Sequence, residues 1–407
     1  MYSFILPNIA NNNLLENIFF NIDWNELNIN FNNTNDVYIN QTLFNSLNII
    51  KTDITKYESK WDIIKKYTNK YEFIHTAIPG YKISISKLKP LSRSFYKMIE
   101  MYNYYDLNNY FNTNIFCFSL AEGPGGFIEA LIYLRQNPND KFTGMTLIDT
   151  NDSNGNIPGW NKANKFLLDN SNVFIEYGPS KNGNLFDPQN YLYISNLYND
   201  SCDLITGDGG FDFSVNYNYQ EIMSIKLIFS QIMYALSIQK QHGCFILKIF
   251  DIFRKINVDL IYLLNIYYKE VYICKPHSSR EANAEKYIVC KDFNINTTNS
   301  ELLIKLKEYF YIFLVNTNNI NNVNIESLFN INHNLNFLNK IKEINTVFGQ
   351  IQIDNILLTL NIINIKNKNE KIEIFKKNNI TKCIEWCKKY QIDYNDNNIF
   401  NTNMFIK

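Results

Sequence analysis

An apolar run that breaks into glycines near residue 120 constrains the fold of this chain more than any other stretch. Residues 115–120 read Ile-Phe-Cys-Phe-Ser-Leu, which is typical of a buried parallel strand, and Ala-Glu-Gly-Pro-Gly-Gly-Phe follows before a helical pattern begins. Glycine lets the backbone turn without a Cβ clash and come close to a ligand. Strand, tight turn and helix in this order predict a nucleotide-like cofactor at the carboxyl end of the strand.

The spacing of these glycines narrows the choice of cofactor. It matches neither Gly-x-Gly-x-x-Gly nor Gly-x-x-x-x-Gly-Lys-[Ser/Thr], so dinucleotide and phosphate-loop interpretations are weakened. An acidic residue beside the glycines suits a cofactor that carries positive charge, and S-adenosylmethionine has a sulfonium and an ammonium group. The candidate cofactor-binding residues here are Glu122, Gly123, Pro124, Gly125, Gly126 and Phe127.

Length, charge and cysteine content are typical of a large protein whose cysteines are reduced. The chain has 407 residues, enough for one large α/β domain with additions or for two domains. Its 39 basic and 39 acidic residues cancel, so only a local patch could indicate a nucleic-acid partner. Seven singly spaced cysteines favour reduced thiols and a cytoplasmic protein, with the nucleus or a virus particle as alternatives. No window approaches the roughly 18 apolar residues of a membrane span, so we expect no membrane partner.

Strands alternate with helices over residues 92–293, which predicts a doubly wound, mostly parallel sheet. The seven expected strands are 115–121, 142–148, 173–176, 202–206, 244–250, 271–274 and 286–290. We divide the chain into a peripheral extension (1–50), a domain with a basic N-terminal part (51–293) and a mostly helical region of unknown role (294–407).

The helical region is expected to form helices near 300–314, 325–345 and 380–390, and no chemistry is evident in it. Cys383 and Cys387 lie four residues apart beside Trp386, but no second Cys or His pair stands nearby. Buried packing is therefore preferred over zinc, and we predict no metal site.

Residues 51–98 are locally basic, with eleven lysines and arginines against four acidic residues. The aromatic residues interleaved with these charges are Trp61, Tyr67, Tyr71, Phe73 and Tyr81. Such a mixture binds phosphates and stacks on bases. A solvated face over an ordinary aromatic core explains it equally simply, and the segment alone favours that alternative.

Four ionisable residues stand at expected strand tips or helix starts on the cofactor side. They are Lys97, Asp208, Lys248 and Glu285. Lys248 lies within Phe-Ile-Leu-Lys-Ile-Phe, where an unpaired buried ammonium would cost several kcal/mol, and Asp208 lies between glycines. Two lysines and two carboxylates can be buried together because their charges nearly cancel.

Such a pocket suits methylation of a hydroxyl group. A ribose 2′-hydroxyl is a poor nucleophile at neutral pH, whereas a sulfonium is already a good electrophile. The enzyme must therefore supply proton removal and alignment, which a lysine with an acidic partner can do without a metal.

Two further aspartates are candidates for contacts to the cofactor. Asp149 ends the strand expected at 142–148, where a carboxylate commonly accepts from both ribose hydroxyls. A helix cap or a turn explains it at least as well. Asp187, at the end of the loop 178–187, is the alternative candidate.

Several of these segments together resemble one known family. They are Ser92-Arg93-Ser94-Phe95-Tyr96-Lys97, Leu120 to Phe127, Gly144-Met145-Thr146-Leu147, Asp208-Gly209-Gly210-Phe211, Lys248, Lys275 to Arg280 and Tyr287-Ile288-Val289. In order and spacing they are similar to the FtsJ-like (RrmJ-type) ribose 2′-O-methyltransferases over about residues 57–293. The Gly-Met-Thr-Leu and Asp-Gly-Gly-Phe segments look most like the eukaryotic and viral enzymes that methylate the first nucleotides of capped mRNA.

The resemblance implies a class I methyltransferase (Rossmann-like) fold, S-adenosylmethionine as the cofactor and RNA, capped mRNA first, as the substrate. It also implies that Lys97, Asp208, Lys248 and Glu285 form the family's catalytic tetrad, with Lys248 deprotonating the 2′-hydroxyl. Other capping or transcription proteins are candidate partners. After Thr146-Leu147 the sequence departs from the cap enzymes' pattern, which leaves the role of Asp149 open.

Other functions remain as alternatives at this stage. An enzyme acting on ribosomal or transfer RNA would carry the same motifs. A catalytically inactive RNA-binding capping subunit would keep the fold, although all four tetrad positions are filled here. A Rossmann-fold oxidoreductase is a weaker third interpretation.

Overall fold

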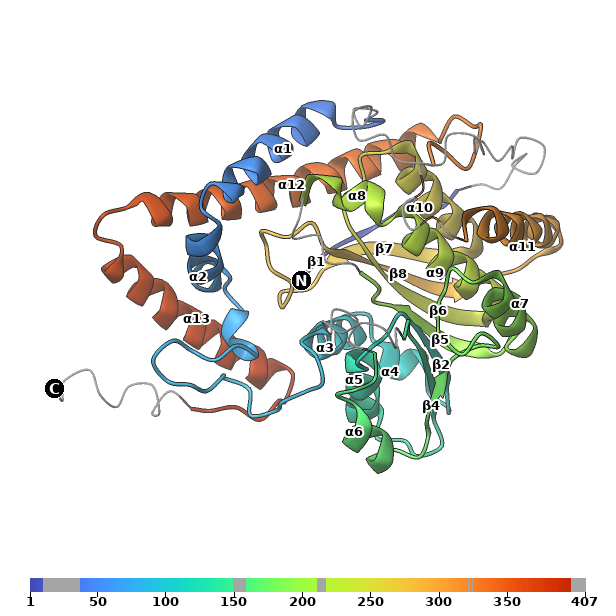
Figure 1. Cartoon of the computed structure of the whole chain (residues 1–407), viewed down its shortest axis with the longest axis horizontal. Coiled ribbons are helices and arrows are strands. Elements are labelled where there is room, and N and C mark those ends of the chain that lie inside the picture. Colours follow the sequence, from blue (N-terminus) through green and yellow to red (C-terminus); the bar gives the residue numbers. More distant parts are fainter. Residues whose placement is uncertain are drawn as a thin grey trace.

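The computed structural model describes residues 1–9, 37–148, 159–210, 217–318, 320, 323 and 325–396. Its centre is one eight-stranded sheet in the order β1-β7-β8-β6-β5-β2-β3-β4 (Figure 1). The strands are β1 (Tyr2–Ile5), β2 (Phe116–Leu120), β3 (Lys141–Met145), β4 (Val173–Glu176), β5 (Cys202–Gly207), β6 (Gln239–Ile249), β7 (Tyr268–Lys275) and β8 (Lys286–Phe293).

The direction of the strands confirms the predicted doubly wound, mostly parallel sheet. Strands β6, β5, β2, β3 and β4 are mutually parallel, while β8 runs antiparallel between β6 and β7. The expected count of seven strands was short by one, because β1 pairs antiparallel with β7. With four residues and both ends exposed, β1 offers no periodic pattern to detect. The carboxyl ends of β2, β5 and β6 therefore meet the start of β8 at one edge of the sheet.

Helices cover both faces of this sheet (Figure 1). Helices α7, α9, α10 and α11 belong to the hydrophobic core on one face, whereas α3, α5 and the end of α13 belong to the core on the other. The helices between β1 and α12 that flank the strands are α3 (Ser94–Tyr104), α4 (Leu107–Tyr110), α5 (Gly126–Arg135), α6 (Asn164–Asp169), α7 (Pro188–Leu197), η3 (Tyr217–Tyr219), α8 (Gln220–Met223), α9 (Ile225–Ile238), α10 (Lys255–Tyr267) and α11 (Thr297–Thr317).

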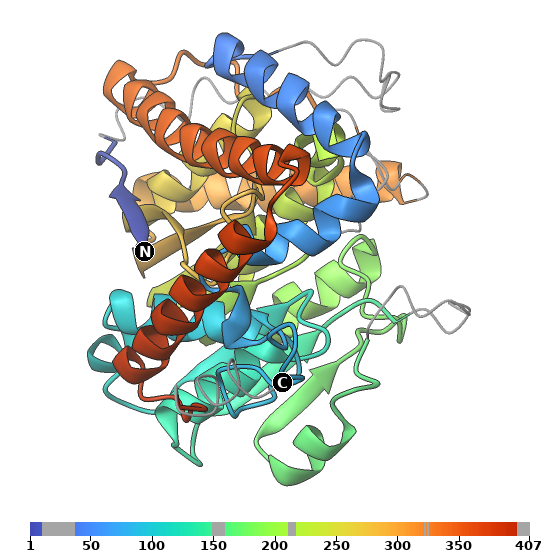
Figure 2. The same cartoon turned by 90° about the vertical axis from the view of Figure 1, so that its left-hand side faces the viewer.

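A group of helices from both ends of the chain, the helical lobe, stands beside the sheet. It consists of α1 (Gln41–Thr55), α2 (Glu58–Thr68), α12 (Leu335–Asn364) and α13 (Asn369–Lys389), followed along the chain from α2 by the short η2 (Glu72–Ile74). Figure 2 shows α12 above and α13 crossing obliquely below it, with α1 and α2 alongside. Segments more than 250 residues apart thus form one body, and the three-part division of the chain stays a prediction.

Helix α12 is longer than the expected helix at 325–345. Gly349 lies within this helix. A side chain at this position would collide with Leu43 of α1, so glycine lets the two helices pack closely. By length and composition alone, α12 and the stretch Gln220–Ile238 could cross a membrane, yet 50% and 94% of their apolar windows are buried inside the protein. Neither helix by itself indicates a membrane protein.

The cysteines take part in packing. All seven are described, free and buried, including Cys383 and Cys387 in the core beneath α13. Among the described residues no group of three or more His, Cys, Asp or Glu side chains is placed to hold a metal ion.

Candidate active site

The glycine turn after β2 packs closely against the residues at the start of α3. Gly125 has φ +110°, in the region that favours glycine, and it forms the N-cap of α5. A side chain at Gly126 would collide with the hydroxyls of Ser92 and Ser94, which precede Lys97 on α3. The absence of Cβ atoms therefore brings the turn against the start of α3. The predicted strand, turn and helix are all present.

Glu122 caps this turn from within. Its Oε1 accepts from the backbone N–H of Phe127 (2.7 Å) and of Ile128 (3.3 Å) at the N-terminus of α5. Its Oε2 is buried and has no hydrogen-bond partner among the described residues. Burial, followed by the nearby charge of Asp208, raises the pKa of Glu122 to about 8. An orphaned carboxylate oxygen beside a Cβ-free turn fits a cofactor that brings a cationic or donor group.

Lys97 and Glu285 form the closed half of the predicted tetrad. Lys97 projects from α3 and contacts Glu285 Oε1 at 2.7 Å, and both residues are buried. Burial lowers the pKa of Lys97, opposed by the charges of Glu285 and Asp208. Burial alone would raise the pKa of Glu285, but Lys97 and Lys248 hold it well below its usual range. The contact with Glu285 thus opposes the effect of burial on the pKa of Lys97, and the contact with Lys97 opposes the effect of burial on the pKa of Glu285.

Asp208 and Lys248 form the open half. Lys248 Nζ, from β6, donates to the backbone oxygen of Asp208 at 2.6 Å and lies 3.3 Å from its carboxylate Oδ1. Their side chains remain 12% and 16% exposed, so solvent and substrate reach this side. Gly209 follows the aspartate, and a Cβ there would lie only 2.9 Å from the Cβ of Ala121, so glycine fits this position.

Tyr287 connects the two halves and was missed as a site residue. Its hydroxyl donates to Asp208 Oδ1 (2.7 Å) and accepts from Lys97 Nζ (3.2 Å). Ser279, also missed, donates to Glu285 Oε1 at 2.6 Å. The available signal was strand alternation, since Tyr287 lies two residues after Glu285 and so points to the same face.

The structure describes only some of the other residues that the sequence places near the cofactor. Asp149 and Phe211 lie outside the described residues, so the role of Asp149 stays a prediction. Asp187 is the N-cap of α7, where its side chain accepts from Gln189 N at 2.8 Å. This gives Asp187 a structural task, and its contact to a cofactor likewise stays a prediction.

The basic segment 51–98 mixes core and surface positions. Trp61 and Phe73 are buried, and Lys51 is buried against Asp251, so these residues support the packing interpretation. Tyr71 is only half-buried and stacks on His277, with ring centroids 4.9 Å apart. The segment is thus neither wholly a surface nor wholly a core.

Comparison with known proteins connects this geometry to one family. A family model described as FtsJ-like methyltransferase matches residues 90–293, which include all four tetrad positions. The cap-specific mRNA (nucleoside-2′-O-)-methyltransferase 1A of Caenorhabditis briggsae is 36% identical over 178 residues, 42% of this chain and 20% of that protein. The inactive cap-specific mRNA (nucleoside-2′-O-)-methyltransferase 1B of the same species is 35% identical over 182 residues, 43% and 21% of the two chains.

The cap-specific mRNA (nucleoside-2′-O-)-methyltransferase 1 of Drosophila melanogaster is 31% identical over 242 residues, 58% of this chain and 29% of that protein. The chain therefore spans less than a third of the length of these relatives.

Proposed function

Because the chain belongs to the FtsJ-like methyltransferase family, whose model matches residues 90–293, we propose that it methylates ribose 2′-hydroxyl groups of RNA. The first nucleotides of capped mRNA are the proposed target, since the relatives described above carry that activity in their names. S-adenosylmethionine is the cofactor of this family and supplies an electrophilic methyl group. Capped mRNA, with other capping or transcription proteins, forms the proposed set of partners.

The residues of the glycine turn suit the cofactor. Gly125 and Gly126 let the turn at the carboxyl end of β2 pack closely against Leu91 and the serines at the start of α3, and Glu122 offers a carboxyl oxygen with no partner among the described residues. Phe127 is buried just behind the turn. These residues would hold the methyl donor, and Asp149 and Asp187 are proposed for further contacts to it.

The tetrad performs the work on the hydroxyl. Lys248 is the more accessible of the two lysines. As the neutral amine it accepts the proton of the 2′-hydroxyl and becomes an ammonium group, which then stabilises the alkoxide that develops there. Asp208 orients Lys248, while Lys97 and Glu285 fix Asp208 through Tyr287. The low exposure of the site strengthens these charge interactions.

The observation that carries this proposal is a continuous series of contacts that joins all four ionisable residues. Lys248 contacts Asp208, the Tyr287 hydroxyl links Asp208 to Lys97, and Lys97 contacts Glu285. A relative named as inactive is about as similar as a relative named as active, so overall identity does not separate the two possibilities. A chain that had lost catalysis would have no need to retain two buried charge pairs, which are costly to maintain.

The test is methyl transfer from labelled S-adenosylmethionine to short RNAs that differ only in the presence of a methylguanosine cap. We expect transfer to the capped RNA, and nuclease mapping should locate the label on the 2′-oxygen of one of the first nucleotides. Transfer only to structured uncapped RNA would keep the chemistry and replace the substrate with ribosomal or transfer RNA. Binding of the methyl donor without transfer to any RNA would favour an inactive subunit.

A further inference from the structure

Three segments far apart in the sequence meet beside the tetrad. Asn379 and Cys383 of α13 donate to backbone oxygens of residues 67–70, which holds α13 against the end of α2. Residues 70–72 in turn contact the loop between β7 and β8, through Lys70 to Glu281 (2.9 Å) and Glu72 to Arg280 (2.6 Å). The loop reaches the tetrad because Ser279 donates to Glu285.

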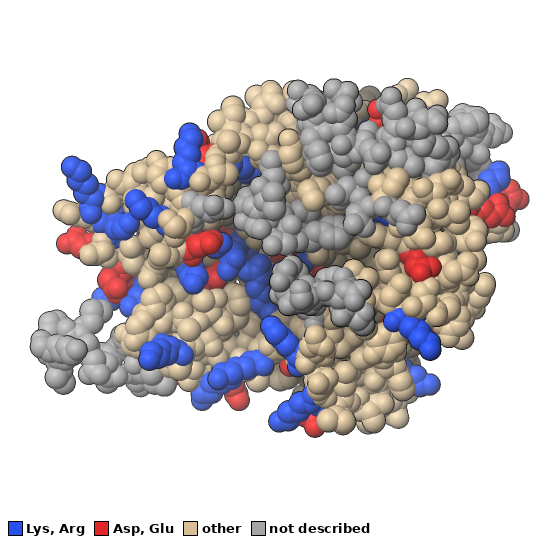
Figure 3. Space-filling model, viewed as in Figure 1, with Lys and Arg blue, Asp and Glu red and all other residues tan. Residues whose placement is uncertain are grey.

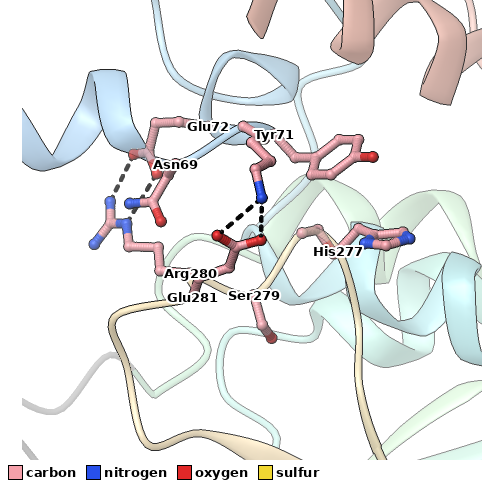
Figure 4. Close-up of a pocket in the computed structure, with 9 residues that line it drawn as sticks. Asn69, Tyr71, Glu72, His277, Ser279, Arg280 and Glu281 are labelled. Atoms are coloured by element: carbon pink, nitrogen blue, oxygen red, sulfur yellow. Dashed lines mark hydrogen bonds and ion pairs between the residues drawn. The ribbon is translucent and has the colours of Figure 1, made fainter. Parts of the chain in front are cut away.

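A small polar pocket lies at this meeting point (Figure 4). Figure 4 shows the Tyr71 ring lying over the His277 ring on one side, with Glu72 facing Arg280 on the other. The pocket has room for about one water molecule, far too little for a nucleotide to be enclosed. A ligand here would therefore rest on the rim and would not be buried.

The rim combines aromatic rings with lysines, and we call it the Tyr71 patch. Its members are Lys70, Tyr71, His277, Lys382, Lys389 and Tyr390. Each of them is at least partly exposed. Lys389 lies 5.1 Å from the centre of the Tyr390 ring, and Lys70, Lys382 and Lys389 are near enough to His277 to help lower its pKa to about 4. His277 is thus a neutral ring at pH 7.

The charge of this region differs from that of the whole chain. Residues 366–389 contain eight lysines and three glutamates, although the complete chain has no net charge. On the face seen in Figure 3, Lys and Arg side chains also gather in the middle, where the helical lobe meets the sheet. Lys382 and Lys389 are seven residues apart on α13, about two turns, so they point to the same side.

We propose that the Tyr71 patch binds a single-stranded segment of the RNA substrate, stacking a base on Tyr71 and neutralising phosphates with Lys382 and Lys389. Aromatic faces flanked by lysines are the usual means of holding unpaired nucleotides without sequence preference. The backbone of residues 277–279 connects the patch to Ser279, which donates to Glu285, so the patch lies beside the buried half of the tetrad. The C-terminal region thereby gains a role, and this inference rests on the proposed RNA substrate.

Binding of a fluorescent ten-nucleotide oligouridylate to the full chain, followed by anisotropy at several salt concentrations, tests the electrostatic half. Each phosphate contact contributes about 0.7 to the slope of log affinity against log salt for single strands, so Lys382→Ala with Lys389→Ala should reduce the slope by about 1.4. The matched control is Lys366→Ala with Lys377→Ala, two exposed lysines of the same region that form no ion pair in the described part of the chain. Equal slopes for the two double variants would overturn the proposal.

The stacking half is tested by Tyr71→Ala, with Tyr71→Phe as the variant that keeps a ring and confirms that the fold tolerates change there. Stacking on one aromatic residue is worth enough that Tyr71→Ala should weaken RNA binding about 5- to 100-fold while Tyr71→Phe stays near wild type. Heparin, a polyanion without bases, should bind both variants equally. If Tyr71→Ala weakens the binding of heparin as much as the binding of RNA, or weakens the binding of neither, stacking on Tyr71 is refuted.

The same samples separate this inference from the proposed function. Binding of labelled S-adenosylmethionine should be unchanged in every variant, because the patch is separate from the glycine turn. If the wild-type chain methylates RNA and all variants bind RNA as tightly as the wild type, the proposed role of the Tyr71 patch is refuted and the proposed function is not. If the wild-type chain binds the methyl donor but binds and methylates no RNA, the proposed function falls with it.

Discussion

Two buried charge clusters lie side by side at the carboxyl edge of the sheet, and they behave as opposites. The tetrad joins Lys97, Asp208, Lys248 and Glu285 through Tyr287, and the side chains of Asp208, Lys248 and Glu285 are 16%, 12% and 11% exposed. The second cluster, the Asp251 cluster, joins Lys51 of α1 (2.8 Å) and Lys286 of β8 (3.3 Å) to Asp251, and all three are at most 8% exposed. Composition is similar in the two clusters, whereas access is not.

The consecutive residues Glu285 and Lys286 divide the two clusters between them. Alternation along β8 directs Glu285 to Lys97 on one face and Lys286 to Asp251 on the other. Burial alone would raise the pKa of Asp251, but the two lysines hold it well below its usual range. The comparison indicates that a buried charge cluster is a candidate catalytic site only where a substrate can reach it. The Asp251 cluster is closed to solvent, and its role is to hold α1 against the sheet.

The largest effect is expected from the open side. Lys248→Ala should lower kcat by roughly 10²- to 10⁴-fold, the contribution typical of a positioned acid–base group. Its thermal stability should stay close to that of the wild type, because Asp208 keeps the Tyr287 hydroxyl as a partner. Steady-state methyl transfer and a thermal melt measure the two quantities. Full activity in this variant would remove Lys248 from the mechanism.

In the closed cluster, the expected loss is in stability. Lys51→Met keeps the volume of the side chain but leaves Asp251 with one lysine, and breaking a buried pair costs about 3 kcal/mol. Lys56→Met is the matched control on the neighbouring surface, because the 66% exposed Lys56 pairs with Asp53 in solvent and its removal should leave stability nearly unchanged. Denaturant unfolding compares them. Equal stability of the two variants would refute a fastening role for Lys51.

A smaller effect is expected at the link between the two halves of the tetrad. Tyr287→Phe removes hydrogen bonds to two charged groups, and kcat should fall roughly tenfold with little change in melting temperature. Tyr268→Phe, which removes a buried hydroxyl bonded to Gln239 away from the site, should leave kcat unchanged. A positioning role for Tyr287 also predicts an altered pH–rate profile; unaltered rate and profile would contradict it.

The smallest effect concerns Glu122 and depends on pH. Its folded pKa of about 8 lies above the ordinary value of 4.5, so between these limits the folded protein holds a proton that the unfolded chain has released. Stability from this residue therefore falls as pH rises through that window. Because the amide does not titrate, Glu122→Gln should melt at a higher temperature than the wild type at pH 8 and at a similar temperature near pH 4.5. A variant that is less stable at pH 8 would show that Glu122 is ionised in the fold.

The tetrad could be predicted from the sequence because each member stands at the end of an apolar run or beside glycines. A charged side chain at such a position is not explained by packing. The sequence was insufficient for Tyr287, because tyrosine is ordinary in a strand and its role depends on the register of β8 against its neighbours. The same limit applies to the Asp251 cluster, whose Lys51 lies 200 residues from its partner and looked like part of a basic surface.

At the level of the fold, the parallel strands were predictable from their continuous apolar runs. The edge strand β1 and the extents of α12 and α13 were not, since they depend on tertiary contacts. Gly349 shows the reason most clearly: within one sequence it suggests a helix end, whereas in the folded chain it makes room for Leu43.

The most direct test of the difference between the clusters is one substitution made in each, Asp208→Asn and Asp251→Asn, followed by both kcat and the free energy of unfolding. Asp208→Asn should lose most of its methyl transfer and keep its stability, because its surroundings are partly exposed. Asp251→Asn should lose stability, since two buried lysines lose their counter-charge, and keep its rate where it is folded. Loss of stability in the first variant, or loss of rate in a folded second variant, would contradict the account.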